Sequence, residues 1–191
     1  MESFSKHQLL HSEALRLIYE RGFKGSTMRD LAERLNCDVA NIYNYIESKQ
    51  HLLESYLFEL SMAFHEGVDQ IIASRHDAKE KVRKLVQLYV QMSYQKPYQM
   101  SLLVNEWRHL EPSRRSEFLA ERKAYEGKVF RMMSLGIRKG QLRKMDPEIA
   151  THLVLAATRW LFTYFTADRA TVNPVELERE ITDFVLHGIG V

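Results

Sequence analysis

Apolar side chains recur at helical spacing near the start of the chain. A first helix is predicted from about residue 5 to residue 21, because apolar positions repeat there at i, i+4, i+7 and i+8. These positions are Leu10, Ala14, Leu17 and Ile18. Gly22 is expected to end this helix with a positive φ angle, which leaves Phe23 able to fold back onto the helix.

Two short helices and a long one are predicted next. Thr27 can cap a second helix, and Asp30 stands three residues later, as in a capping box with a shorter acid. Asn36 suits the tight turn that follows, because asparagine tolerates positive φ. A short third helix is predicted over residues 38–45, and Ser48 can cap a long fourth helix.

The rest of the chain is predicted to form five more helices. Their expected ranges are 77–95, 97–107, 112–139, 147–165 and 174–187. Alternating runs of β-branched residues, which would indicate strands, are missing. The predicted fold class is therefore all-α, with about nine helices.

The predicted domain border lies close to the start of the fourth helix. Residues 1–50 are expected to form an N-terminal domain of three helices. Residues 51–191 are expected to form a larger helical C-terminal domain. Because the fourth helix continues across the border, we expect no flexible linker between the two domains.

Composition adds a prediction of where the protein is found but does not indicate what it binds. The chain has 45% hydrophobic and 27% charged residues, no apolar run of about 18 residues, and a polar N-terminus without the apolar core of a signal peptide. With its single cysteine, Cys37, these features predict a cytoplasmic protein with no membrane partner. Lys and Arg number 27 against 25 acidic residues, and residues 1–50 hold seven of each. Global charge therefore does not indicate nucleic acid.

No pattern of catalytic residues stands out. His7 and His11 are four residues apart, as metal ligands on one helix face can be, but no further ligand is spaced to complete a site. Cys37 lies in a predicted turn without a recognisable base, and no glycine-rich phosphate loop occurs. We therefore expect no enzyme activity, no bound metal and no cofactor.

The second and third helices have the layout of a DNA-binding helix-turn-helix. Such pairs also occur in proteins that do not bind DNA, so a helical interaction module that lacks DNA binding is the alternative. The residues themselves closely resemble the N-terminal signature of the TetR (tetracycline-repressor) family over about residues 8–57. The matching stretches are 15–23 (LRLIYERGF), 26–32 (STMRDLA), 41–43 (NIY), 48–49 and 52–53.

This resemblance implies a homodimeric transcriptional repressor. Such a protein binds double-stranded operator DNA through two recognition helices and is released by a small-molecule effector in a variable C-terminal domain. The chain departs from the family pattern at Asn36, where glycine is usual, at Asn41, where threonine is common, and over residues 44–46, where Tyr-His-Phe is common. These departures indicate a different operator, whose sequence stays open.

Nine residues are candidates to contact DNA: Thr27, Arg29, Val39, Ala40, Asn41, Tyr43, Asn44, Tyr45 and Lys49. Thr27, Tyr43 and Lys49 are expected at phosphates, which fix register but carry no base information. The alternatives are that Thr27 only caps its helix, Tyr43 is a core aromatic and Lys49 is an ordinary solvated lysine. Arg29 can reach the DNA backbone or pair with Glu33 one turn later.

The third helix is expected to contact the bases. Asn41 or Asn44 can bind adenine through two hydrogen bonds, and Val39 or Ala40 can contact a thymine methyl group. Tyr45 lies on or near the same face. These assignments depend on which way the third helix is turned.

The ligand-binding candidates of the C-terminal domain are Trp107, Arg108, Tyr125, Trp160 and Tyr164. The stretches 106–110 (EWRHL), 136–140 (GIRKG) and 160–164, with the pair Arg122 and Tyr125, resemble a branch that contains acyl-CoA-responsive regulators. The resemblance implies a small apolar or acyl-CoA-like effector. Aromatic residues at helical spacing are also typical of an ordinary core.

Arg108, Arg122 and Arg159 could meet an anionic head group of such an effector. The alternative for each is structural ion pairing with a nearby glutamate, namely Glu106, Glu111 or Glu126.

The last two helices are expected to form the homodimer as a four-helix bundle. The predicted apolar stripes consist of Val154, Leu155, Thr158, Leu161 and Phe162 on one helix and Ile181, Val185 and Leu186 on the other. The alternative is that both stripes complete the core of a monomer.

Overall fold

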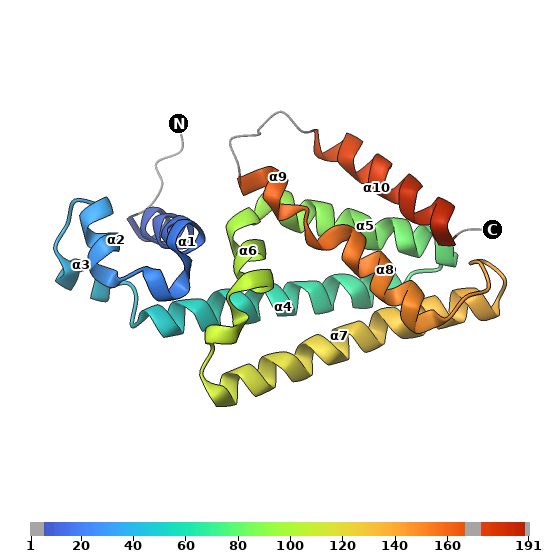
Figure 1. Ribbon diagram of the computed structural model, residues 1–191, viewed down its shortest axis with the longest axis horizontal. Coiled ribbons are helices and arrows are strands. Elements are labelled where there is room, and N and C mark those ends of the chain that lie inside the picture. Colours follow the sequence, from blue (N-terminus) through green and yellow to red (C-terminus); the bar gives the residue numbers. More distant parts are fainter. Residues whose placement is uncertain (1–5, 167–172, 190–191) are drawn as a thin grey trace. The chain divides into compact units, whose positions relative to one another are not determined.

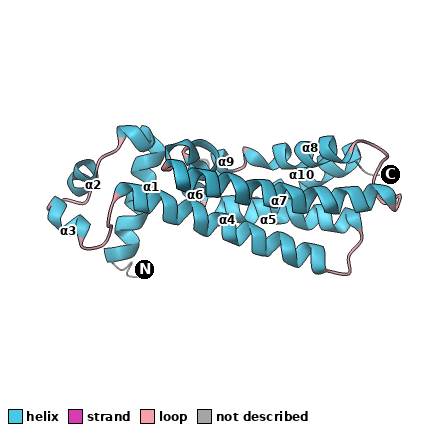
Figure 2. Cartoon of the chain, turned by 90° about the horizontal axis from the view of Figure 1, so that it is seen from below, coloured by secondary structure: helices cyan, strands magenta, loops and turns pink. Residues whose placement is uncertain are grey.

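The computed structural model describes residues 6–166 and 173–189. The described residues form ten α-helices and one short 3-10 helix, and no strand (Figures 1 and 2). In chain order these are α1 (Lys6–Gly25), α2 (Met28–Arg34), α3 (Val39–Tyr43), α4 (Lys49–Ala73), α5 (Ala78–Gln95), α6 (Pro97–Asn105), η1 (Trp107–His109), α7 (Pro112–Arg138), α8 (Pro147–Arg159), α9 (Phe162–Thr166) and α10 (Pro174–Ile189). The all-α fold class is confirmed.

The predicted helix over residues 147–165 is two helices in the structure. α8 ends at Arg159, Trp160 forms its C-cap, and α9 begins at Phe162. The prediction of nine helices therefore counted α8 and α9 as one. Among the described residues, no helix is both long and apolar enough to cross a membrane.

Packing divides the chain into two compact units. The first unit consists of Met1–Leu60 and Tyr98–Phe118, and the second consists of Ser61–Pro97 and Leu119–Val191. Helices α4 and α7 therefore contribute residues to both units. The predicted domain border at residue 50 cuts the chain once, whereas each compact unit contains two separate stretches of the chain. The border stays a prediction.

The core of the first unit confirms the predicted apolar face of α1. Leu10, Ala14, Leu17 and Ile18 are buried, in one cluster with residues of α2, α3, α4 and α6. Phe23 also lies in this cluster, so it folds back onto α1 as expected. Each fully buried leucine or isoleucine contributes about 1.5–3 kcal/mol to stability, and the cluster fixes the position of the short helices.

The turns of the first unit follow the predicted backbone chemistry. Gly22 takes the positive φ expected of it, 73°, although its ψ of 161° is extended rather than left-handed helical. Asn36 has a φ of 49°, so it supplies the conformation that glycine would supply at this turn. The hydroxyl oxygen of Ser48 accepts a hydrogen bond from the His51 N–H at 3.0 Å, which confirms the cap at the start of α4.

The second unit is built around α5. Helix α5 packs against α8, α9 and α10, and its buried residues include Val82, Leu85 and Val86. Two predicted helix starts are confirmed here. Asp146 accepts hydrogen bonds from two N–H groups at the start of α8, and Asn173 accepts one from the Val175 N–H at the start of α10.

The predicted dimer stripes are wrong in detail. The structure buries most of these side chains in the interior of the second unit. The fully buried members are Val154, Thr158, Leu161, Phe162, Ile181 and Val185, while Leu155 and Leu186 are half-buried. Helical periodicity identifies an apolar stripe, but it does not say whether the stripe faces the same chain or a partner. The homodimer itself stays a prediction.

Gly136 on α7 offers a test of the second unit's packing. A Cβ atom built there would lie 2.6 Å from Cβ of Ala78 and 2.8 Å from Cδ1 of Leu142. We expect Gly136→Ala to lower the free energy of unfolding by about 1–3 kcal/mol, because overpacking forces the neighbours apart. Urea unfolding measures the effect. Gly188→Ala in α10, where the added Cβ meets nothing within 4 Å, is the matched control and should not destabilise. Equal stability of both variants would contradict the close approach.

Candidate DNA-binding site

Helices α2 and α3 pack against each other across the Asn36 turn. Leu31, Ala32 and Ile42 are their buried contacts with the core. The start of α2 has the predicted capping box: Thr27 Oγ1 accepts a hydrogen bond from the Asp30 N–H at 3.1 Å, and Asp30 Oδ2 accepts one from the Thr27 N–H at 2.8 Å. The hydrogen bond from the Thr27 hydroxyl is the main cause that lowers the pKa of Asp30.

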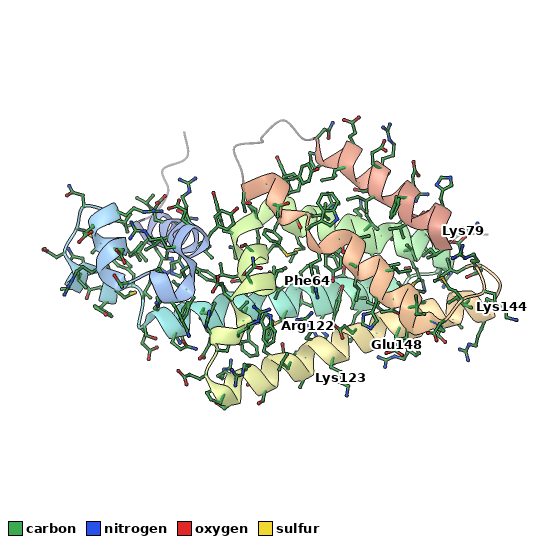
Figure 3. All side chains as sticks on the ribbon, viewed as in Figure 1. Phe64, Lys79, Arg122, Lys123, Lys144 and Glu148 are labelled. Carbon is green, nitrogen blue, oxygen red and sulfur yellow. The ribbon has the colours of Figure 1, made fainter. Side chains whose placement is uncertain are left out.

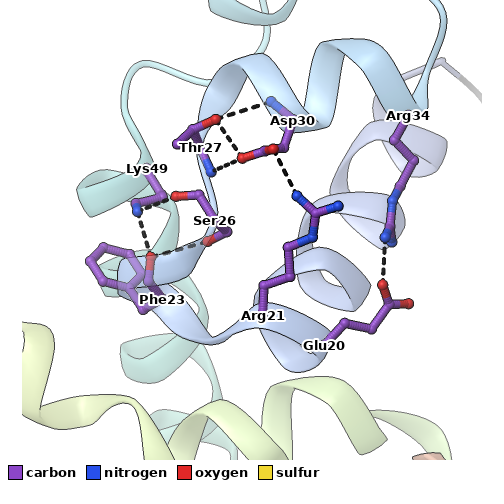
Figure 4. A network of polar contacts seen from close by, with 8 residues as sticks. All are labelled: Glu20, Arg21, Phe23, Ser26, Thr27, Asp30, Arg34 and Lys49. Carbon is purple, nitrogen blue, oxygen red and sulfur yellow. Dashed lines mark hydrogen bonds and ion pairs between the residues drawn. The ribbon is translucent and has the colours of Figure 1, made fainter.

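Ion pairs hold α2 against α1 (Figure 4). The Arg21 guanidinium pairs with Asp30 at 2.7 Å, and the Arg34 guanidinium pairs with Glu20 and, at 3.7 Å, with Glu13. The hydrogen bond from Arg34 lowers the pKa of Glu20. Exposed pairs of this kind add about 0–1 kcal/mol each, so their contribution is mainly to orientation. They also show that part of the N-terminal positive charge is used within the protein.

Lys49 joins the start of α4 to the segment between α1 and α2. Its ammonium donates hydrogen bonds to the carbonyl oxygens of Phe23 and Ser26 and lies 4.3 Å from the centre of the Phe23 ring (Figure 4). Burial lowers the pKa of Lys49. Two of the three N–H groups of the ammonium are thus already engaged. A phosphate contact by Lys49 stays a prediction, and a structural role is now evident beside it.

Phe23 is also held by the segment between α6 and α7. Glu106 Oε2 accepts a hydrogen bond from the Phe23 N–H at 3.2 Å, and the His109 ring stacks on the Phe23 ring with centres 5.7 Å apart. Gln50 donates a hydrogen bond to the His109 carbonyl oxygen at 3.1 Å. Sequence reasoning missed this role of Glu106 and His109. The sequence feature that pointed to this role was Gly22. Its positive φ leaves the N–H of Phe23 without a helical hydrogen bond, so this N–H needs another acceptor.

The exposed face of α3 carries the predicted base-contacting residues. Ala40, Asn41 and Asn44 are exposed, and Tyr43 and Tyr45 are 53% and 44% exposed. Val39 is half-buried and packs against the core cluster, so less of it is available to DNA. Thr27, the N-cap of α2, and Arg29 on α2 are exposed as well. Helix α3 ends at Tyr43, two residues earlier than predicted, so Asn44 and Tyr45 lie just after it. The structure therefore brings amide and phenol groups together on, and directly after, one short helix of the size that enters a major groove.

Tyr45 also contacts α1. Its ring centre lies 6.4 Å from that of His7, and the His7 ring lies 4.2 Å from the His11 ring. His11 Nδ1 and the Tyr56 hydroxyl are 2.6 Å apart, and burial lowers the pKa of His11. The described residues contain no group of three or more His, Cys, Asp or Glu side chains that could hold a metal ion. His11 packs against Tyr56 of α4, whereas His7 is exposed and contacts His11 and Tyr45.

The structure divides the predicted ligand-binding residues between the two units. Trp107 and Arg108 belong to the first unit, where Trp107 packs against the core cluster and the Arg108 guanidinium lies 5.5 Å from its ring centre. Tyr125, Trp160 and Tyr164 belong to the second unit. Tyr125 is buried there, and the rings of Trp160 and Tyr164 are in contact, with centres 5.1 Å apart.

The three arginines predicted to meet an anionic head group have different surroundings in the structure. Arg122 pairs with Glu126 at 3.3 Å, as the structural alternative predicts. Arg108 instead contacts Trp107, and Glu106 is engaged with Phe23. Arg159 is exposed at the end of α8.

A braced helix-turn-helix with an exposed third helix, in an all-helical chain, is the architecture of the class of DNA-binding transcriptional regulators. Residues 10–56 match the family described as "Bacterial regulatory proteins, tetR family", and residues 75–189 match "Tetracyclin repressor-like, C-terminal domain". These matches cover most of the sequence, and the chain belongs to the TetR family.

Individual relatives are distant in sequence but similar in fold. The HTH-type transcriptional repressor KstR2 of Rhodococcus jostii (strain RHA1) is 22% identical over 182 residues, which cover 92% of this chain and 87% of that protein. The structure of the ketosteroid transcriptional regulator KstR2 of Mycobacterium tuberculosis superposes with a TM-score of 0.89 at 18% identity and covers 100% of this chain and 97% of its own. AibR in complex with isovaleryl coenzyme A and operator DNA gives a TM-score of 0.77 at 19% identity, with 94% and 97% coverage.

Substitutions at Lys49 and Tyr43 distinguish a residue that stabilises the helix-turn-helix from a residue that contacts DNA. We expect Lys49→Met to lower the free energy of unfolding by about 1–3 kcal/mol, because two carbonyl oxygens lose a charged donor. Tyr43→Ala removes an exposed side chain, so it should change stability by less than about 0.5 kcal/mol and weaken binding to all DNA sequences alike. Thermal unfolding and DNA titration measure the two effects. Full stability of Lys49→Met, together with a salt slope of DNA binding reduced by about 1, would instead assign Lys49 to a phosphate.

Proposed function

We propose that this protein is a ligand-released homodimeric repressor of the cytoplasm that binds a partly palindromic operator. The observation that carries the proposal is that a braced helix-turn-helix exposes Asn41 on α3 and Asn44 and Tyr45 directly after it. Asparagine side chains bind adenine edges through paired hydrogen bonds, and Thr27 and Tyr43 are suited to phosphates.

The size of α3 supports a dimer. A helix of five residues contacts only a few base pairs, so a specific site requires two such helices about 34–36 Å apart in successive major grooves. The last two long helices also expose large apolar side chains. They are Ile149 and Leu153 on α8 and Val175 and Phe184 on α10, with exposures between 55% and 77%. These residues replace the buried stripes as the proposed dimer contacts.

The proposed effector is a small apolar or acyl-CoA-like metabolite. AibR, which shares the fold, has been solved with isovaleryl coenzyme A. In this chain the second unit holds Tyr125, Trp160 and Tyr164, which could bind the apolar part of such a molecule. Arg159, exposed at the end of α8, could meet a phosphate of the coenzyme A part.

Release of DNA requires that the effector favours a different arrangement of the dimer. Helices α4 and α7 have residues in both units, so they are the proposed route from the effector to the helix-turn-helix. A ligand with equal affinity for both arrangements would shift nothing. The effector must therefore bind the DNA-incompetent dimer more tightly, and operator DNA must weaken effector binding by the same factor.

Phe184 tests the proposed dimer contacts. It is 77% exposed, and we expect Phe184→Glu to produce a monomer at micromolar concentration, because a charge would be buried against the partner. Light scattering after size-exclusion chromatography measures the mass. Leu119→Glu on α7, at a residue that is 40% exposed, is the matched control and should stay dimeric. A dimeric Phe184→Glu variant would place the interface elsewhere, and a monomeric wild-type protein would contradict the dimer.

Reciprocal binding tests the proposed induction. The operator is first obtained by selection from random double-stranded DNA. We then expect isovaleryl-CoA or a longer acyl-CoA to bind the free protein more tightly than the operator complex, and to weaken operator binding by the same factor. Calorimetry and fluorescence anisotropy measure the two affinities, with coenzyme A alone as the control. An acyl-CoA that binds both states equally is not the inducer.

A further inference from the structure

Two histidines on α1 connect the interior of the first unit to its predicted DNA-binding face. The His11 ring contacts Tyr56 of α4, and the exposed His7 ring lies 4.2 Å from the His11 ring, measured between centres. The His7 ring also contacts Tyr45, which lies just after α3 and is 44% exposed. Figure 3 draws the described side chains of these helices as sticks. A change at His11 can therefore reach a side chain that is predicted to contact DNA.

The hydrogen bonds around His11 suit a neutral ring. His11 Nδ1 lies 2.6 Å from the Tyr56 hydroxyl oxygen, and that hydroxyl lies 3.3 Å from the His11 carbonyl oxygen. Burial raises the pKa of Tyr56, so the hydroxyl keeps its proton and can donate it to this carbonyl oxygen. With a proton on Nδ1, the ring then donates to the hydroxyl oxygen, and every proton has an acceptor.

The other ring nitrogen of His11 has no such partner. His11 Nε2 is buried and makes no hydrogen bond within the described part of the chain. A protonated ring carries a proton on both nitrogens, so Nε2–H would be a buried donor without an acceptor, which costs free energy. Burial, as the largest cause, and the neighbouring His7 lower the pKa of His11 from its ordinary value of 6.5, while Glu59 on α4 opposes them. From the end of α3, the Tyr45 phenol faces His7.

We propose that His7 and His11 form an acid-sensitive switch of the DNA-binding unit, in which protonation of His11 displaces the His7 ring from Tyr45 and weakens operator binding. A protonated His11 has to turn its ring or admit water to Nε2, and the exposed His7 ring beside it is the group that can yield. Two protonated rings at 4.2 Å would also repel each other. The inference rests on the operator binding of the proposed function but not on its effector.

The sign of the pH dependence follows from the lowered pKa of His11. The folded protein binds this proton less readily than the unfolded chain, so the stability that neutral His11 provides is lost as the pH falls below about 6.5. If DNA binds the form with neutral His11, operator binding releases protons in this range. Exposed histidines that become charged in acid have the opposite effect, because positive charge strengthens binding to DNA. A loss of affinity in acid therefore distinguishes the switch from general charge.

Operator affinity at two pH values is the first test, measured by fluorescence anisotropy. Between about pH 7.5 and about pH 5.5, the affinity of the wild type should fall about 3- to 10-fold, since one pKa unit of linkage corresponds to about 10-fold. His11→Asn does not titrate, and its amide can replace Nδ1 beside Tyr56, so its affinity should stay constant or rise in acid. His76→Asn removes an exposed histidine of the second unit and is the matched control, which should keep the wild-type loss.

Substitutions at His7 test the connection to Tyr45. His7→Ala removes the ring that contacts Tyr45 at every pH, so this variant should bind the operator at neutral pH as weakly as the acidified wild type. His7→Phe keeps an uncharged ring at this position and should retain the neutral-pH affinity. A His7→Ala variant with wild-type affinity and the wild-type loss in acid would overturn the inference.

Proton release is the second test, and it requires the wild type alone. Calorimetry of operator binding at about pH 6, in two buffers with different enthalpies of ionisation, counts the protons that are exchanged. We expect net release on binding. Net uptake would mean that DNA favours protonated histidines, and would overturn the inference even where a variant does not fold.

The outcomes separate this inference from the proposed function. Operator binding at neutral pH tests the repressor, and the change on acidification tests the switch. A wild type whose affinity rises in acid as that of His11→Asn does overturns the switch and leaves the repressor standing. Absence of operator binding at neutral pH contradicts the proposed function and, with it, this inference.

Discussion

The contact of the Lys49 ammonium with the carbonyl oxygens of Phe23 and Ser26 is the interaction on which the DNA-binding unit depends. Helical hydrogen bonding is interrupted at Gly22, so the backbone groups that follow need other partners. The Phe23 N–H donates a hydrogen bond to the Glu106 carboxylate. The Phe23 carbonyl oxygen accepts hydrogen bonds from the Lys49 ammonium and the Ser26 hydroxyl. The segment between α1 and α2 is thus held by α4 and by the residues before α7. The position of α2 and α3 follows from this bracing.

The same bracing engages several positive charges of the N-terminal region within the protein. Arg21 and Arg34 pair with acids of the first unit, and Lys49 is half-buried against backbone carbonyls. The exposed face of α3 offers neutral amides and phenols, with Asn41 and Tyr43 among them. Such a surface is suited to hydrogen bonds with base edges.

Local features of the fold were predictable from the sequence, and long-range ones were not. The Thr27 cap and the positive φ of Asn36 depend on residue type and immediate neighbours, and both are confirmed. Periodicity identified Val154 and Ile181 as apolar positions but assigned them to a dimer interface, whereas the structure buries them within the chain. The packing of Trp107 against the core of the first unit was not foreseen either, and its role in ligand binding stays a prediction. Which apolar surfaces meet is decided by packing between segments far apart in sequence.

The central claim is that the exposed face of α3 recognises a specific DNA sequence. Selection from random double-stranded DNA by the full-length protein, followed by a salt titration of the selected site, tests this claim most directly. The account predicts a partly palindromic motif with half-sites about 10 base pairs apart, and an affinity whose logarithm falls linearly with the logarithm of the salt concentration. The absence of any enriched motif, with no salt-dependent binding, would contradict the account and favour a helical interaction module without DNA binding.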